Sequence, residues 1–234
     1  MRIIAGAHKG SRLVTPSGAN TRPTSDRVKE SLFSMLEGYG VIKAANVLDL
    51  FAGSGGLGFE AMSRGAAEVD FVDSAGTSAR AIESNAEKLG IDHSTRIHTA
   101  DVVAYLAGQR AGGVHESFDE GRIFDLVFMD PPYPLGEDAV TQILGKLTGF
   151  LDLESIVVVE RSARTPEPTM PAGLEVFRSK TFGETAVYFI QLEGESDESD
   201  EPDKSDKSDE PDKSDESDEP DKLDEPDKSD TATT

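Results

Sequence analysis

The sequence predicts an α/β fold built on a doubly wound, seven-stranded and mostly parallel sheet. Three observations predict it: short apolar runs, helical patterns between these runs, and two β-like runs that end near residue 192. Buried strands of a parallel sheet have nearly continuous apolar sequences, and their alternation with helices implies right-handed crossovers with helices on both faces. The apolar runs are residues 46–51, 68–73, 95–98, 124–129 and 155–160.

A small β-hairpin and a helix are expected before the first of these strands. Residues 3–5 and 11–14 flank a glycine-containing turn, which is typical of a hairpin. A helix is expected to begin near Thr24 or Ser25, because both residue types are good N-caps and apolar side chains follow at helical spacing. These elements form an N-terminal extension, residues 1–40, that precedes the core domain.

The remaining elements complete the sheet and its helical layers. Between the second and third strands, residues 75–89 carry apolar side chains at helical spacing, so a crossover helix is expected there. After the fifth strand, residues 174–178 and 185–192 flank a short turn around Gly183. They predict an antiparallel hairpin at the edge of the sheet, which ends the core domain, residues 41–192.

Charge is distributed unevenly along the 234 residues, whose net charge is −22. Residues 193–234 hold 20 acidic residues against five lysines, whereas residues 1–29 hold six basic residues against one acid. The acidic segment repeats Glu-Pro-Asp-Lys four times and contains almost no apolar side chain, so burial cannot offset the entropy of ordering it. We therefore expect a disordered acidic tail at residues 193–234, whereas the N-terminal extension is locally basic.

Composition excludes several classes of protein. The chain contains no cysteine, which excludes a disulfide scaffold, a thiolate metal site and a thiol nucleophile. No apolar run approaches the roughly 18 residues of a membrane span, and the first residues lack the apolar segment of a secretory signal. The four histidines are scattered along the sequence and suggest no metal site. We expect a cytoplasmic monomer that binds neither a metal nor a membrane.

A glycine loop directly follows the first core strand. Gly53, Gly55 and Gly58 match the pattern G-x-G-x-x-G, and Asp73 ends the second strand 20 residues after Gly53. Glycines let a ligand approach the backbone at the carboxyl edge of the sheet, and the acid can accept hydrogen bonds from ribose hydroxyls. The pattern predicts a cofactor with a nucleoside part.

Two acids near this loop favour S-adenosylmethionine over NAD. Asp49 precedes the loop, where its carboxylate can pair with the ammonium group of a methionine moiety, which NAD lacks. Asp101 and Val102 follow the third strand, where an acid and an apolar side chain can contact an adenine amine and ring edge. The expected cofactor contacts are Asp49, Phe51, Ala52, Gly53, Ser54, Gly55, Asp73, Asp101 and Val102.

The fourth strand runs directly into Asp130-Pro131-Pro132-Tyr133, which we expect to be the catalytic loop. The proline rings fix φ and remove two backbone donors, so the loop presents carbonyl acceptors and one carboxylate. An exocyclic base amine is a hydrogen-bond donor that needs such acceptors. Bonds to Asp130 and the Pro131 carbonyl would aim the lone pair of the amine at a sulfonium methyl group. Asp130 can then accept the proton, while Tyr133 stacks on the base.

These motifs together resemble the class I S-adenosylmethionine-dependent methyltransferases that modify base amines, whose marker is (Asn/Asp)-Pro-Pro-(Tyr/Phe). More narrowly, residues 22–33, 49–61 and 130–133 are similar in order and spacing to the RsmD type of ribosomal RNA guanine-N2 methyltransferase. The resemblance implies a Rossmann-like fold and methylation of the N2 amine of one guanine in 16S rRNA, within a small-subunit particle that contains protein. The acidic tail has no counterpart in the family pattern.

The basic extension then acquires an expected role in holding RNA. Basic side chains can contact phosphates and orient the substrate without reading its sequence, which makes the affinity depend on salt. The expected RNA contacts are Arg2, Lys9, Arg12, Arg22, Arg27 and Lys29. Pairing of Arg22 and Arg27 with acids of the core domain is the alternative interpretation.

Other functions remain open on the residues alone. A DNA amino-methyltransferase acting on adenine N6 or cytosine N4 would use the same loop and cofactor, although the chain has no room for a separate DNA-recognition domain. Cytosine C5 methylation is disfavoured, because its usual mechanism needs a thiolate. An NAD dehydrogenase accounts for the glycines but not for residues 130–133, and a non-catalytic RNA-binding assembly factor leaves that loop without a task.

Overall fold

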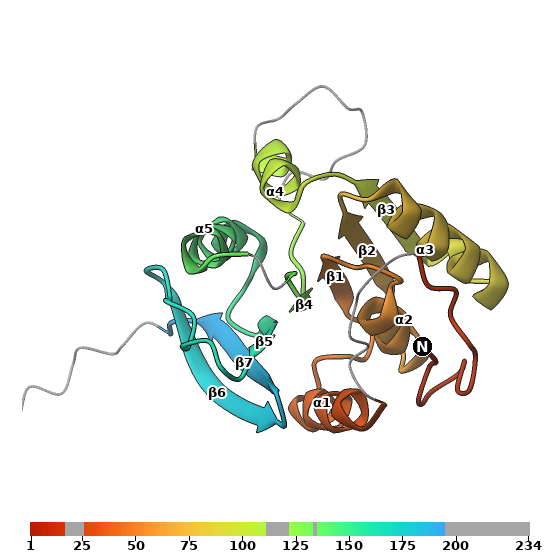
Figure 1. Ribbon diagram of the computed structural model, residues 1–234, viewed down its shortest axis with the longest axis horizontal. Helices are drawn as coiled ribbons and strands as arrows, with labels where there is room; N and C mark the ends of the chain where they lie inside the picture. Colours follow the sequence, from red (N-terminus) through yellow and green to blue (C-terminus); the bar gives the residue numbers. More distant parts are fainter. Residues whose placement is uncertain (17–25, 111–121, 133–134, 195–234) are drawn as a thin grey trace, which may run out of the picture. The chain divides into compact units, whose positions relative to one another are not determined.

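The computed structural model contains a seven-stranded sheet composed of β1 (Asn46–Leu50), β2 (Glu68–Asp73), β3 (Thr95–Thr99), β4 (Leu126–Met129), β5 (Ile156–Ser162), β6 (Leu174–Phe182) and β7 (Thr185–Leu192). The strand order is β3-β2-β1-β4-β5-β7-β6 (Figure 1). Strands β1 to β5 pair in parallel, whereas β7 is antiparallel to both β5 and β6. The predicted sheet and its antiparallel edge hairpin are confirmed. The structure describes residues 1–16, 26–110, 122–132 and 135–194.

Helices cover both faces of the sheet, and each face buries its own apolar cluster. On one face lie α1 (Asp26–Tyr39), α2 (Gly56–Ser63) and α3 (Gly76–Leu89); on the other lie α4 (Val102–Arg110) and α5 (Glu137–Leu147) (Figure 1). Two 3-10 turns, η1 (Asp92–Ser94) and η2 (Thr148–Phe150), precede β3 and follow α5. Strand side chains alternate between the clusters, as the two-residue period of a strand requires. In β4, Phe128 packs on the α1 side and Met129 on the α5 side.

The strand register brings the predicted site residues to one edge of the sheet. Leu50 in β1 pairs with both Val72 in β2 and Met129 in β4. Met129 also pairs with Val159 in β5. Because the carboxyl ends of parallel strands meet at the same edge, Asp130 begins its loop beside the ends of β1 and β5.

The N-terminal extension packs on the same core as the sheet. Arg2 and Arg12 form an isolated antiparallel bridge, and the Ile3 N–H donates to the Ser11 carbonyl at 3.0 Å. The predicted chain reversal is confirmed, although it forms one bridge rather than two strands. Ile3 and Leu13 are buried in the apolar cluster that α1, α2 and α3 build on their face of the sheet.

Several predicted features lie outside the described residues. They are the N-cap residues Thr24 and Ser25, the basic residue Arg22, the aromatic residue Tyr133 and the tail from residue 195 onward. The three-part division of the chain stays a prediction. In the part of the chain that the structure describes, no helix combines the length and apolarity that a membrane crossing needs.

Candidate active site

The glycine loop between β1 and α2 adopts a backbone that favours glycine. Gly53 and Gly55 have positive φ angles of 57° and 77°, and the non-glycine residue Phe51 has one of 59°. A Cβ on Gly58 would lie only 2.3 Å from the Phe71 ring of β2. The first two glycines therefore shape the turn, and the third allows α2 to pack closely on the sheet.

Asp49 lies in β1, one residue before the strand ends. It is buried, with 2% of its surface exposed, and its Oδ2 accepts a 2.9 Å hydrogen bond from the Gly58 N–H. Burial raises the pKa of Asp49 to about 8; the Gly58 bond opposes the rise, and the negative charge of Asp73 adds to it. A cation placed beside this carboxylate would favour its ionised form.

Asp73 ends β2 and braces the glycine loop. Its Oδ2 accepts the Gly53 N–H at 2.8 Å, and its Oδ1 accepts the Ala75 N–H at 2.8 Å. A carboxylate offers about four acceptor positions, so both oxygens keep capacity for further donors. The carboxylate joins the loop to the chain that enters α3, and its predicted bonds to ribose hydroxyls stay a prediction.

The other predicted cofactor residues have structural tasks of their own. Asp101 is exposed and caps α4, because its Oδ1 accepts a 3.0 Å hydrogen bond from the Ala104 N–H. Val102 is 3% exposed and belongs to the apolar cluster on the α4 side of the sheet. Ala52 and Ser54 are buried in the glycine loop. Their contacts with a cofactor stay predictions.

Asp130 directly follows β4 and is exposed at the carboxyl edge of the sheet. Desolvation by the surrounding chain raises the pKa of Asp130 well above its usual range, and the negative charges of Glu160 and Asp49 raise it further. Because water reaches the exposed surface of Asp130, desolvation raises its pKa less than full burial would, and we attribute the rise mainly to the like charges. A raised pKa makes the ionised carboxylate a better proton acceptor.

Leu135 is bonded both to Pro132 and to β5. The Pro132 carbonyl accepts a 2.9 Å hydrogen bond from the Leu135 N–H. Arg161, whose side chain is 8% exposed, pairs with Glu137 at the start of α5 and donates to the Leu135 carbonyl at 3.5 Å. These contacts hold Leu135 between β5 and the start of α5. Stacking by Tyr133, outside the described residues, stays a prediction.

Sequence reasoning missed Glu160 and Arg161, which lie near the end of β5. Val159 pairs with Met129 in the neighbouring strand, so Glu160 follows at the level where Asp130 begins its loop. The predicted strand at residues 155–160 does end in this acid. Only the strand order makes it a neighbour of Asp130, and the sequence does not state that order.

The N-terminal segment contacts the glycine loop at two points that the sequence did not predict. The Met1 side chain packs on Gly56, where an added Cβ would lie 2.1 Å from the sulfur. Asn85 on α3 is fully buried and donates to the carbonyls of Ser54 and Val14 at 3.1 and 3.0 Å. Its Oδ1 accepts the Val14 N–H at 2.7 Å. The basic extension therefore borders the glycine loop.

The predicted RNA contacts divide into exposed and buried side chains. The exposed ones are Arg2, Lys9, Arg12 and Arg27. Arg2 also pairs with Asp26 at 2.7 Å. Lys29 is only 1% exposed, and its ammonium lies 3.1 Å from the buried carboxylate of Glu60. The prediction that Lys29 contacts RNA is wrong, because a phosphate cannot reach an ammonium enclosed in the protein.

His98 contacts acidic and aromatic side chains. Among the described residues, no group of three or more histidine and acidic side chains is arranged to hold a metal ion. His98 in β3 bonds to Asp70 at 2.9 Å, and its ring centroid lies 4.8 Å from that of Tyr105. Arg122 also contacts Asp70, at 3.0 Å. This histidine has a structural environment in the sheet.

Known proteins resemble the chain over nearly all of its described length. A family model described as conserved hypothetical protein 95 matches residues 1–191. Ribosomal RNA small subunit methyltransferase D of Escherichia coli K12 is 34% identical over 199 residues, which cover 84% of this chain and 93% of that protein. YlbH of Bacillus subtilis 168 is 33% identical over 198 residues, which cover 83% of this chain and 100% of that protein.

Solved structures share the fold and the extent of the match. The structure of yhhF from Escherichia coli has a TM-score of 0.69 at 33% identity and covers 82% of this chain and 98% of its own. A hypothetical protein from Thermus thermophilus has a TM-score of 0.67 at 26% identity and covers 82% of this chain and 99% of its own. The similarity thus includes the N-terminal extension as well as the sheet.

Proposed function

Because the chain belongs to the conserved hypothetical protein 95 family, together with ribosomal RNA small subunit methyltransferase D, we propose that it methylates ribosomal RNA. In detail, we propose transfer of a methyl group from S-adenosylmethionine to the exocyclic N2 amine of a guanine in 16S rRNA of a small-subunit particle. One observation carries the proposal: a buried acid beside a glycine loop and an exposed acid before two prolines share one edge of the sheet.

The residues at the end of β1 fit S-adenosylmethionine. The pKa of Asp49 is raised to about 8 by burial, so a neighbouring ammonium group would offset the cost of ionising it. The space next to Gly53 is open, since the nearest atom to an added Cβ is the Phe51 carbonyl oxygen at 4.0 Å. Asp73 keeps acceptor capacity for ribose hydroxyls. When bound, S-adenosylmethionine supplies an electrophilic methyl group.

The loop after β4 is proposed to hold and activate the guanine amine. Asp130 and the Pro131 carbonyl would accept its two N–H groups, which turns the nitrogen lone pair out of the ring and toward the methyl carbon. Transfer of the methyl group from sulfur to this nitrogen would leave positive charge on the nitrogen. A carboxylate oxygen of Asp130 would then accept the proton of this nitrogen, and the raised pKa of Asp130 favours that transfer.

The extension supports RNA as the substrate. Its exposed basic side chains are Arg2, Lys9, Arg12 and Arg27. Arg2 adjoins Met1, which packs on Gly56 beside the glycine loop, so a phosphate held by Arg2 would lie near the proposed cofactor. Such contacts give affinity and orientation without reading sequence, and the target base must then be presented to the loop after β4.

Methyl transfer from labelled S-adenosylmethionine to small ribosomal subunits that lack the modification tests the proposal. We expect label in 16S rRNA, recovered as N2-methylguanosine after digestion, and much less label on purified DNA. Label on DNA as N6-methyladenine or N4-methylcytosine, with none in the subunits, would contradict the proposal. Label in neither substrate would contradict the catalytic role of the loop at Asp130.

A further inference from the structure

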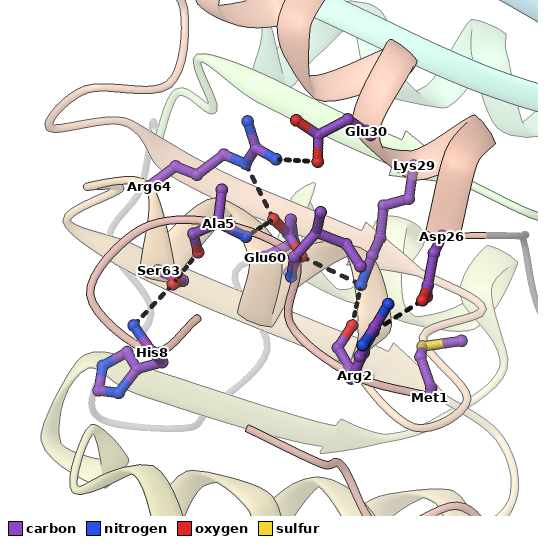
Figure 2. A network of polar contacts seen from close by, with 12 residues as sticks. Met1, Arg2, Ala5, His8, Asp26, Lys29, Glu30, Glu60, Ser63 and Arg64 are labelled. Atoms are coloured by element: carbon purple, nitrogen blue, oxygen red, sulfur yellow. Dashed lines mark hydrogen bonds and ion pairs between the residues drawn. The ribbon is translucent and has the colours of Figure 1, made fainter. Parts of the chain in front are cut away.

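Glu60 on α2 is a fully buried carboxylate that binds four donors (Figure 2). Its Oε2 accepts the Ile4 N–H at 2.8 Å and lies 3.1 Å from Lys29 Nζ. Its Oε1 accepts the Ala5 N–H at 3.0 Å and the Arg64 Nε–H at 2.9 Å. A buried carboxylate is costly unless it is paired and hydrogen-bonded, and both conditions are met here. Two of the donors belong to the extension backbone.

Lys29 extends this contact from α2 to α1 and to the start of the chain. Its Nζ donates to the Arg2 carbonyl at 2.6 Å in addition to pairing with Glu60. Arg64, on the other side of Glu60, pairs with the more exposed Glu37 at 3.0 Å. The buried charges are therefore compensated, and a single carboxylate joins α1, α2 and the N-terminal segment.

Ser63, the last residue of α2, also holds the N-terminal segment on this helix, through uncharged groups. The Ser63 hydroxyl donates to the Ala5 carbonyl at 2.5 Å and accepts the His8 N–H at 2.9 Å, while the Ser63 carbonyl accepts the Ala7 N–H at 2.7 Å. Gly6 has φ +79°, and a Cβ there would lie 1.7 Å from the Ser63 carbonyl oxygen. Residues 4–8 thus run along α2 in one fixed position.

We propose that Glu60 is a positioning residue for the RNA substrate, an inference that rests on the proposed function. Glu60 holds the backbone between the exposed side chains of Arg2 and Lys9. The same helix begins at Gly56, against which Met1 packs beside the glycine loop. Phosphate contacts set the register of a nucleic acid on a protein, so the place of the extension determines where the target base arrives.

The proposal is tested with Glu60→Gln, with Lys29→Met and with the double variant. Glu60→Gln leaves the buried Lys29 ammonium without its carboxylate, so we expect the KM for small subunits to rise at least about tenfold. Lys29→Met leaves Glu60 paired with Arg64 alone, so its KM should rise less. The KM for S-adenosylmethionine and the kcat at saturating subunits should stay near wild type. The double variant leaves no unpaired charge between these positions and should recover part of the lost affinity, whereas the loss caused by weaker bonds to the Ile4 and Ala5 N–H groups should remain. Glu37→Gln, a change at the exposed rim of the network, is the matched control and should have no effect.

Salt dependence separates positioning from direct contact. Each phosphate contact contributes about 0.7–0.9 to the slope of log affinity against log salt concentration. We expect the double variant to keep the wild-type slope, because Lys29 is buried. A slope smaller by about that amount would show that Lys29 contacts phosphate and would overturn the proposal. If the single variants do not fold, the KM and slope of the double variant decide the question.

Amide hydrogen exchange at Ile4 and Ala5 measures how firmly Glu60 holds this backbone and needs no substrate. Both amides donate to Glu60, so they should exchange faster in Glu60→Gln than in wild type and than in Glu37→Gln. Unchanged exchange, or single variants with a wild-type KM for subunits, would overturn the inference. Failure of the proposed function would instead appear in the wild-type protein, as absence of label in the subunits.

Discussion

The ends of β1 and β4 carry acids on the same edge of the sheet, and the two acids are built in opposite ways. Asp49 is 2% exposed, accepts a backbone hydrogen bond from Gly58 and precedes a turn made by glycines with positive φ. Asp130 is exposed and precedes two prolines, which have no backbone N–H to donate. Each has a raised pKa, but only Asp49 is enclosed by the core.

The difference separates folding from chemistry. The end of β1 is part of the core, so its shape is set when the sheet and α2 pack together. The end of β4 lies at the surface, where a base can reach it. A change at Asp49 should therefore alter stability and cofactor affinity together, whereas a change at Asp130 should alter turnover alone.

Asp130→Ala should break the exposed end while leaving the buried end intact. Loss of a positioned proton acceptor typically costs about 10²–10⁴-fold in rate, so we expect at least about a hundredfold lower kcat. The Kd for S-adenosylmethionine and the melting temperature should change little, because the side chain is exposed. Single-turnover methyl transfer and cofactor titration measure the two quantities. Asp138→Ala, an exposed acid in the first turn of α5, is the control, and full activity in Asp130→Ala would remove Asp130 from the mechanism.

Asp49→Asn should affect the buried end in two opposite directions. The amide oxygen can still accept the Gly58 N–H, but it cannot pair with an ammonium group, so cofactor affinity should fall about tenfold or more. The variant also removes a carboxyl that is costly to ionise, at about 1.4 kcal/mol per pKa unit, so the melting temperature near pH 8 should rise by several degrees. A lower melting temperature would contradict the pKa of about 8.

The pH dependence of the wild-type protein follows from the same carboxyl. The folded chain holds the Asp49 proton more tightly than the unfolded chain, in which the group titrates near 3.8. The contribution of Asp49 to stability therefore falls as pH rises from about 4 to about 8. Cofactor affinity should rise toward pH 8, by at most about tenfold per pH unit, because binding a cation favours the ionised form. In Asp49→Asn, the dependence of stability on pH, measured by thermal unfolding, and that of cofactor affinity, measured by calorimetric titration, should both be weaker.

Glu160→Gln should sharpen the contrast with a smaller effect. Removing the negative charge beside Asp130 should lower the pKa of Asp130 and move the acidic limb of the kcat–pH profile to lower pH, by about one unit or less. The profile of Glu154→Gln should stay unchanged, because this exposed acid precedes β5 at the opposite edge of the sheet. A shift toward higher pH would contradict the proposed role of the like charge.

Deletion of residues 195–234 should have the smallest effect. The tail carries most of the net negative charge, so its removal should raise affinity for small subunits at low salt, by less than about tenfold. The deletion keeps the 3.0 Å hydrogen bond from the Glu193 N–H to the Gly173 carbonyl, which closes the end of β7. Unchanged affinity in filter-binding measurements would make the tail a solubilising segment only.

Sequence patterns predicted the strands and the glycine loop because local chemistry determines both. Five short apolar runs became β1 to β5, and the glycines took the positive φ angles and the close helix contact that the motif requires. The proximity of Asp130 and Glu160 could not be predicted, because it depends on the pairing of β4 with β5, which the sequence does not state. Asn85 was missed for the same reason: it lies on α3 but bonds to Ser54 and Val14, which are remote in sequence.

The burial of Lys29 could have been predicted from its position on the helix. Lys29 shares the i, i+3, i+4, i+7 spacing of Leu32, Phe33 and Leu36, and these four residues form the buried face of α1. A basic residue count treats Lys29 and Arg27 as equivalent. The helix turns one into the protein and the other into solvent, which only an assignment of faces reveals.

The packing of Met1 on Gly56 has a practical consequence for recombinant work. The sulfur of Met1 lies where a side chain on Gly56 would be, and the Ser54 hydroxyl lies 3.8 Å from it. An affinity handle fused before Met1 would have to leave the fold from a residue that touches the glycine loop. A handle placed after Thr234 is separated from the sheet by 40 residues beyond Gly194, so carboxyl-terminal fusions are the better choice for assays of cofactor affinity.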